Sequence, residues 1–137
     1  MNRIAFNSTW LPRMLSIMRI VVGFLFMGHG GQKLFNFPPS PQAIPHLPPL
    51  MLVAGVLEFF GGFLILMGLF TQPVALVLAG EMAVAYSLAH APHGFWPMVN
   101  KGELAVLYCF VFLYLATAGA GPWSLDRLRR RRGVGSC

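Results

Sequence analysis

Long apolar stretches, separated by short polar or proline-rich segments, dominate the hydrophobic pattern of this chain. Each apolar stretch is close to the ~20 residues that an α-helix needs to cross the hydrocarbon core of a bilayer. The pattern therefore predicts an all-α membrane protein, a bundle of four transmembrane helices at about residues 14–35, 50–70, 74–91 and 102–119.

The segments between these stretches contain residues that interrupt helices. Residues 36–49 hold too many prolines for the interior of a helix or strand, so we expect an irregular loop. The triplet Thr71-Gln72-Pro73 predicts a tight turn between the second and third spans. A loop from His90 to Lys101 follows the third span, and the chain begins with a polar arm (residues 1–12) and ends with a basic tail (residues 124–137).

The composition is typical of a membrane protein rather than a soluble domain. Hydrophobic residues make up 56% of the 137 residues and charged residues only 10%, too few to cover the surface of a small soluble protein. At this length we expect one domain, so residues 1–137 are predicted to form a single transmembrane unit. The first apolar stretch is too long for the core of a signal peptide, and no cleaved signal is expected.

The net charge of +6 is concentrated towards the ends of the chain. Arg3 and Arg13 precede the first span, and five arginines lie between Arg127 and Arg132. By the positive-inside rule both termini should face the cytoplasm, which predicts a multi-pass protein of the bacterial inner membrane. A basic run directly after an apolar helix fits anionic lipid headgroups, and we expect the lipid bilayer and no nucleic acid as a partner.

The two cysteines are far apart in the sequence, at Cys109 and Cys137. They form no Cys-x-x-Cys motif, so the sequence predicts no self-contained dithiol redox centre. We expect Cys109 to act as a small apolar packing residue.

One face of the first span combines charge with glycine. Arg19, Gly23, Phe26, Gly30 and Lys33 recur at helical spacing and should therefore share a face. The glycines allow a neighbouring helix to approach closely, and two cations at membrane depth require anions opposite them.

Two carboxylates interrupt the apolar stretches, Glu58 in the second span and Glu81 in the third. A charge at such a depth costs about 2.5–3.5 kcal/mol on insertion scales, so each should have a compensating partner. The predicted topology places Arg19 level with Glu81, and places Lys33 and Glu103 together towards the outer end. We therefore predict an inner cluster of Arg19 with Glu81, joined by Glu58, and an outer cluster of Lys33 with Glu103 and a histidine.

These charges have two interpretations. They can be structural ion pairs that hold the helices together, because an unpaired charge is not tolerated at this depth. Alternatively, if Glu81 neutralises Arg19, then Glu58 lacks a partner and can hydrogen-bond a carbonyl ligand or relay a proton. On this basis Glu58 and Glu81 are the candidate catalytic residues, and Glu81→Gln, rather than Glu58→Gln, is expected to impair folding.

Other polar and aromatic side chains are candidates to hold a ligand. His29 and His90 can bind a metal or a quinone carbonyl, or they can simply be solvated or hydrogen-bonded. The spacing His90-x-x-His93 spans a proline, and we predict no metal site. On the fourth span the inward-facing candidates are Glu103, Leu107, Phe110, Tyr114 and Thr117. The predicted ligand-binding residues are Arg19, His29, Lys33, His90, Glu103 and Tyr114.

From Arg19 to Asp126 the chain resembles the DoxX family of small bacterial membrane proteins. The resemblance rests on Gly28-His29-Gly30 with Lys33, Glu58-Phe59-Phe60-Gly61-Gly62, Glu81-Met82-Ala83-Val84-Ala85-Tyr86, Gly94-Phe95-Trp96-Pro97, Asn100-Lys101-Gly102-Glu103-Leu104 and Gly121-Pro122-Trp123-Ser124-Leu125-Asp126. It implies a four-helix membrane protein whose functional residues map to Arg19, Lys33, Glu58, Glu81 and Glu103. One departure is Gln72, where relatives often carry arginine, and this weakens the orientation signal at that turn.

The resemblance implies a function as well as a fold. Some relatives are linked to thiosulfate:quinone oxidoreduction and others to oxidative-stress or thiol-homeostasis complexes. We therefore expect a membrane subunit of a redox or quinone-linked system, with a bound quinone, an oxidoreductase partner and no covalent cofactor. The alternative is a non-enzymatic module, such as a small transporter, chaperone or assembly factor, whose ion pairs are structural.

The sequence leaves two further properties open. Whether the protein is an enzyme is undecided; if it is, it is an oxidoreductase component that depends on a partner or a bound quinone. The glycine-rich faces permit a homo-oligomer without specifying one.

Overall fold

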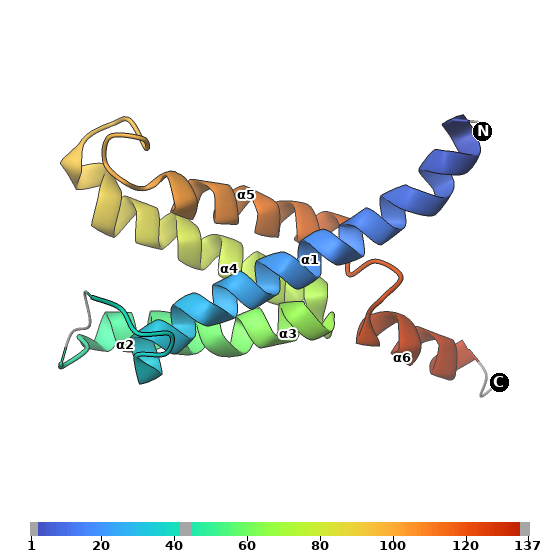
Figure 1. The fold of residues 1–137 in the computed structure, drawn as a ribbon, viewed down its shortest axis with the longest axis horizontal. Helices are drawn as coiled ribbons and strands as arrows, with labels where there is room; N and C mark the ends of the chain where they lie inside the picture. Colours follow the sequence, from blue (N-terminus) through green and yellow to red (C-terminus); the bar gives the residue numbers. More distant parts are fainter. Residues whose placement is uncertain (1–2, 42–44, 135–137) are drawn as a thin grey trace.

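The computed structural model describes residues 3–41 and 45–134, and side chains within 7–133. All secondary structure in these ranges is helical (Figure 1). The elements are α1 (Arg3–Phe35), α2 (Pro49–Val56), the π-helical η1 (Leu57–Gly61), α3 (Gly62–Met67), α4 (Thr71–Ala85), the π-helical η2 (Tyr86–His90), the 3₁₀-helical η3 (Ala91–His93), α5 (Glu103–Ala118) and α6 (Leu125–Val134). The predicted roles of the Arg3 side chain and of Cys137 lie outside the described residues.

Three helical segments are long and apolar enough to cross a membrane, at Asn7–Phe35, Pro49–Met67 and Thr71–His93. The fourth predicted span corresponds to α5, a shorter apolar helix of 16 residues. The all-α membrane architecture is therefore confirmed, whereas the count of four crossings stays a prediction. Both ends of the chain lie at the same end of the molecule (Figure 1), and their cytoplasmic location also stays a prediction.

The first helix begins much earlier than the hydrophobic pattern predicts. Residues 3–12 belong to α1, with Pro12 inside the helix, and do not form a separate polar arm. Polarity alone does not prevent helix formation, and α1 continues through Pro12 although a proline inside a helix removes one backbone hydrogen bond and crowds the carbonyl four residues earlier. The hydroxyl of Ser16 donates to the carbonyl of Pro12 at 3.3 Å.

The second span is one continuous helical segment, α2–η1–α3, with a π-helical turn at its centre. It ends at Gly68, which adopts the left-handed conformation (φ 66°) that favours glycine. The turn to α4 therefore lies at residues 68–70, and the predicted turn at residues 71–73 is wrong because α4 already starts at Thr71. Pro73 still occupies the first turn of α4, where its missing N–H costs nothing.

Two pairs of helices build the molecule. The second-span segment packs along α1, and α4 packs along α5 (Figure 1). The approach of α1 to α3 is close enough to require glycine on both sides. A Cβ on Gly23 would lie 2.8 Å from the Cα of Leu66, and a Cβ on Gly62 would lie 2.8 Å from the Cα of Met27. The structure thus confirms the close helix approach that the glycine face of the first span predicts.

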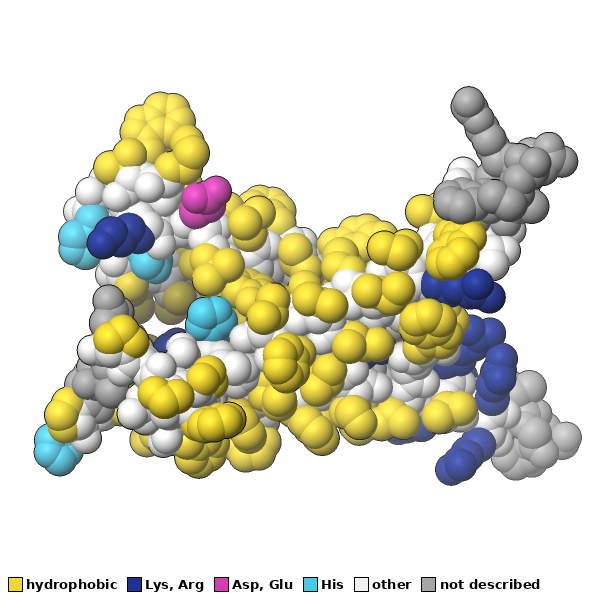
Figure 2. Space-filling view, in the orientation of Figure 1, with side chains coloured by type: hydrophobic (Ala, Val, Ile, Leu, Met, Phe, Trp, Pro, Cys, Tyr) yellow, Lys and Arg dark blue, Asp and Glu magenta, His cyan; other side chains and the backbone are white. Residues whose placement is uncertain are grey.

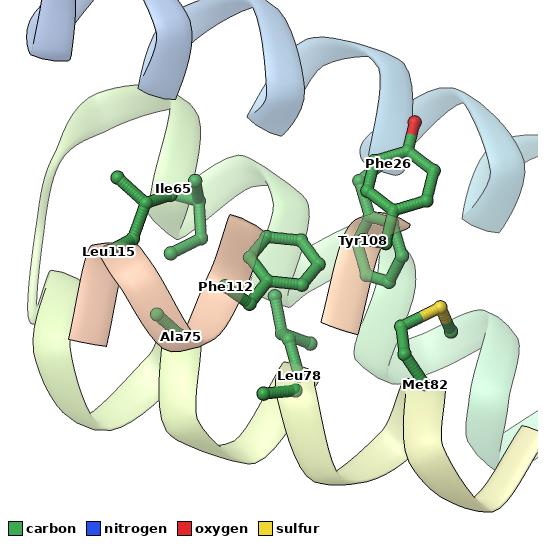
Figure 3. Packing of buried hydrophobic residues seen from close by; sticks show 9 residues of the cluster. Phe26, Ile65, Ala75, Leu78, Met82, Tyr108, Phe112 and Leu115 are labelled. Carbon is green, nitrogen blue, oxygen red and sulfur yellow. The ribbon is translucent and has the colours of Figure 1, made fainter. Parts of the chain in front are cut away.

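The hydrophobic core lies where the two pairs meet. Phe26 of α1, Leu78 of α4 and Phe112 of α5 are fully or almost fully buried and lie together (Figure 3). The rings of Phe26 and Phe112 meet edge to face with their centroids 4.8 Å apart. Large apolar side chains that remain exposed cover the outer surface along the middle of the molecule, as expected for contact with lipid (Figure 2).

The inward face of α5 differs from the predicted one. Tyr108, Phe112 and Leu115 are buried, whereas the predicted residues are exposed: Glu103, Leu107, Phe110, Tyr114 and Thr117. The helix is apolar on all sides, so its periodicity carries no information about which face meets the core.

The helix crossing at Gly23 can be tested by adding one methyl group. Gly23→Ala should lower the free energy of unfolding by about 1–3 kcal/mol, because the backbone of α3 would have to move away. Gly28→Ala is the matched control on the same helix, since a Cβ there meets nothing within 4 Å. Thermal unfolding of both variants in mild detergent measures the difference; equal stability of the two would contradict the close crossing.

Candidate functional site

A buried ion pair joins the end of α1 to the π-helical turn of the second span. The Nζ atom of Lys33 lies 2.6 Å from Oε1 of Glu58, and their side chains are 28% and 5% exposed. Gly30 makes this contact possible, because a Cβ at that position would collide with the backbone of Phe59. The π-helical turn, in which one extra residue fits into the helix, is a feature that recurs at functional sites.

Glu81 of α4 brings a second carboxylate to this pair. It is close enough to Glu58 and Lys33 to interact with both charges. Both carboxylate oxygens of Glu81 and the Oε2 atom of Glu58 are buried and have no hydrogen-bond partner among the described residues. Two acids therefore share one lysine, and three carboxylate oxygens remain available for hydrogen bonding.

Two aromatic side chains lie near these carboxylates. Tyr108 of α5 is near enough to Glu58 to interact with its charge. The imidazole ring of His29 meets the ring of Tyr108 edge to face, at 6.0 Å between centroids. We call Lys33, Glu58, Glu81 and Tyr108 the Glu58–Glu81 cluster; His29 lies next to it.

The cluster has the chemistry to bind a small polar ligand and to exchange a proton with it. A carboxyl group without a protein partner accepts a hydrogen bond when ionised and donates one when protonated. The ammonium group of Lys33 already balances the charge of Glu58, which leaves Glu81 as the group that a ligand can engage. No group of three or more His, Cys, Asp or Glu side chains in the described ranges is arranged to hold a metal ion.

Arg19 lies in a separate polar centre, and its predicted pairing with Glu81 is wrong. The Arg19 side chain is fully buried and donates only to backbone carbonyls. Its Nε reaches the carbonyl of Ala120 at 2.8 Å, its Nη1 reaches those of Ile65 and Leu66 at 2.5 Å, and its Nη2 reaches that of Trp123 at 2.5 Å. The guanidinium group thus satisfies carbonyls at the end of α3 and in the segment after α5, which would otherwise be buried without donors.

Asp126 completes this second centre, and sequence reasoning missed its role. Its carboxylate accepts hydrogen bonds from the backbone N–H groups of Phe70 and Thr71, at 2.8 and 2.9 Å, and so caps the start of α4. It is also close enough to Arg19 for their charges to interact. Asp126 is the only aspartate of the chain, but 55 residues separate it from Thr71, so no local pattern could reveal the contact.

The predicted outer cluster does not form. Glu103 is exposed at the start of α5, beside a groove of about 330 Å³ that Lys101 and Met98 also line, while Lys33 pairs with Glu58. The Nδ1 atom of His90 lies 3.0 Å from the carbonyl oxygen of Asn100, and this contact holds the loop after the third span. Tyr114 is 55% exposed on the outer face of α5. Of the predicted site residues, the fold therefore gathers His29, Lys33, Glu58 and Glu81, and leaves Arg19, His90, Glu103 and Tyr114 elsewhere.

Comparison with known proteins agrees with this description of a membrane protein. Residues 14–91 match the family model described as DoxX. An uncharacterised protein of Haemophilus influenzae is 44% identical over 120 residues, which cover 84% of this chain and 90% of that protein. Two inner membrane proteins of Escherichia coli, YphA and YqjF, are 30% and 31% identical over 85% of this chain and 90% and 92% of their own lengths. No solved structure matches this chain.

The role of Arg19 can be tested by a substitution that preserves its charge. Arg19→Lys should lower the free energy of unfolding by about 2 kcal/mol or more, because an ammonium group cannot reach carbonyls on two segments at once. Arg13→Lys, in the exposed part of α1, should have little effect. Thermal unfolding in mild detergent compares the two variants; an unchanged melting temperature for Arg19→Lys would show that the carbonyl contacts do not stabilise the fold.

Replacing either intramembrane glutamate by glutamine should change the stability of the protein to a different extent. Glu58→Gln should lower the free energy of unfolding by about 1–3 kcal/mol, since it removes the carboxylate that directly contacts Lys33. Glu81→Gln should be tolerated, because Glu81 has no hydrogen-bond partner among the described residues to lose. Accumulation in membranes and thermal unfolding measure both; stable Glu58→Gln and unstable Glu81→Gln would restore the pairing of Arg19 with Glu81 that the sequence predicts.

Proposed function

This chain belongs to the DoxX family of bacterial inner-membrane proteins, and we propose that it binds a small quinone-like ligand at the Glu58–Glu81 cluster, as the membrane subunit of a redox system. The proposal is carried by one observation, the three buried carboxylate oxygens of Glu58 and Glu81 that have no hydrogen-bond partner among the described residues. A buried polar atom without a partner costs about 1–3 kcal/mol. A ligand that supplies the missing hydrogen bonds would offset this cost.

The chemistry of a quinone fits these groups. Its carbonyl oxygens accept hydrogen bonds from a protonated carboxyl group, and the hydroxyl groups of its reduced form donate to a carboxylate. Glu81 is the residue that would make this contact and exchange the proton, while Lys33 holds Glu58 in place. Tyr108 within the cluster and His29 next to it provide aromatic edges that a flat ring can contact.

The position of the cluster suits a ligand that enters from one end of the molecule. Lys33 belongs to the last turn of α1 and its side chain is 28% exposed, so the polar centre is not sealed. Figure 2 shows the molecule hollowed at the end where α1 finishes, with histidine side chains at the border of the hollow. The sequence carries no flavin, haem or iron–sulfur motif, so in this proposal electrons are exchanged with the ligand by an oxidoreductase partner.

The second candidate function is a non-enzymatic membrane module, such as a small transporter, chaperone or assembly factor. It is supported by Arg19, whose buried donors bind backbone carbonyls and hold the fold without any ligand. The direct contact of Lys33 with Glu58 can be structural in the same way. Glu81 separates the two proposals, because its carboxylate is buried and yet makes no hydrogen bond within the described residues.

Replacing Glu81 by an apolar residue of similar size tests the proposed function. Glu81→Met should fold with equal or higher thermal stability, since it removes a buried carboxyl group that has no protein partner. The same variant should lose about tenfold or more in affinity for a quinone, which corresponds to one hydrogen bond to a charged group. The measurement is mass spectrometry of quinone retained by the protein after purification in mild detergent, with added quinone titrated back.

Glu103→Met is the matched control, because Glu103 is exposed and lies away from the cluster. It should leave quinone retention unchanged. If wild type retains only bulk phospholipid, or if Glu81→Met and wild type retain the same quinone, the ligand proposal is wrong and the structural module takes its place.

A further inference from the structure

A groove at the opposite end of the molecule carries chemistry that the proposed function does not use. It measures about 530 Å³ and lies between the N-terminal turns of α1 and the segment that leads into α6. It is lined by Pro12 and Arg13 of α1, by Trp123 of the segment before α6, and by Arg127, Leu128 and Arg131 of α6 itself. Three arginines from two distant parts of the chain therefore line one groove.

No carboxylate side chain among the described residues lines this groove beside the three arginines. The chain contains four acidic residues in all. Glu58 and Glu81 belong to the Glu58–Glu81 cluster. Glu103 is the first residue of α5, and the groove lies near the opposite end of α5. Asp126 does not line the groove and accepts two backbone N–H groups of the α4 start. The positive charge of the groove is therefore available to an anion from outside the chain.

Guanidinium groups match one kind of anion especially well. Their planar, forked donors bind phosphate oxygens in pairs, which a compact ammonium group cannot do. Arg127 and Arg131 are one helical turn apart on α6, so both can reach the same anion, and Arg13 approaches from α1. Figure 2 shows Lys and Arg side chains gathered at this end of the molecule.

The surroundings of the groove favour a phosphate that belongs to a lipid. The first candidate membrane span begins at Asn7, so the groove lies where the spanning part of α1 starts. Trp123 and Leu128 provide an apolar wall and are 52% exposed. Tryptophan and arginine side chains are typical of the headgroup region.

We propose that this groove binds the phosphate headgroup of an anionic phospholipid, with Arg13, Arg127 and Arg131 around the phosphate and the start of the acyl chains against Trp123 and Leu128. The groove is built into the bundle, because the backbone N–H of Asp126 donates to the carbonyl of Gly68 at 2.9 Å and so fixes the start of α6. A bound lipid would therefore join α1 to α6 by placing a negative charge between arginine side chains that repel one another.

The experiment compares two double variants that remove the same charge. Arg13→Gln with Arg131→Gln removes two arginines from the groove, whereas Arg129→Gln with Arg130→Gln removes two that line neighbouring surfaces of α6. The full chain is purified in mild detergent and titrated with phosphatidylglycerol or phosphatidylcholine, and bound lipid is counted by native mass spectrometry. We expect one phosphatidylglycerol to bind in preference to phosphatidylcholine, and its affinity to fall about tenfold or more only in the groove variant.

Three results would overturn the proposal. Equal weakening in both double variants would show diffuse attraction by the basic helix rather than a site. Equal binding of phosphatidylglycerol and phosphatidylcholine would show that charge is not recognised. Displacement of the bound lipid by millimolar inorganic phosphate would assign the groove to free phosphate instead of a headgroup. Thermal unfolding of both variants, expected to be unchanged because all four side chains are exposed, shows that the loss is not a folding defect.

Discussion

The contacts of one buried guanidinium group determine how the helices of this protein are joined. In an apolar environment every backbone carbonyl at a helix end needs a donor, and water is not available to supply it. Arg19 of α1 supplies these donors to the last turn of α3 and to the segment after α5, so three parts of the chain meet at one side chain. Asp126 extends the junction by capping the start of α4. The positions of α1, α3, α4 and α6 therefore depend on one another at this end.

The other end of α1 carries the second polar centre, at Lys33. The two centres differ in how many of their hydrogen-bonding groups have a partner. At Arg19 the donors of the guanidinium group are bound to carbonyls. At the Glu58–Glu81 cluster one lysine serves two acids, and three buried oxygens have no partner in the described chain. A protein selected only for stability would gain by replacing Glu81 with an apolar residue. Its presence is the reason to place function there.

The two ends of the molecule therefore differ in the chemistry that they offer to a partner. The Glu58–Glu81 cluster is acidic, buried and suited to a small ligand that carries hydrogen-bonding groups. The arginine groove between α1 and α6 is exposed, basic and suited to a phosphate. The uncharacterised relative in Haemophilus influenzae and the inner membrane proteins YphA and YqjF align with this chain over about 90% of their lengths, so the residues at both ends can be compared with theirs.

The sequence by itself determined the membrane class, the approximate spans and the glycine face of α1. It also showed which few charged residues interrupt the apolar stretches. Each of these follows from local composition or from helical periodicity. Only the tertiary structure decided which charges meet. Arg19 turned to backbone carbonyls and Lys33 to Glu58, since the depth of a side chain depends on helix tilt and on the π-helical turn, which no local pattern encodes. The inward face of α5 was likewise undecidable, because a helix that is apolar all round can turn any side to the core. Asp126 caps a helix from 55 residues away, and such a contact exists only once the chain has folded.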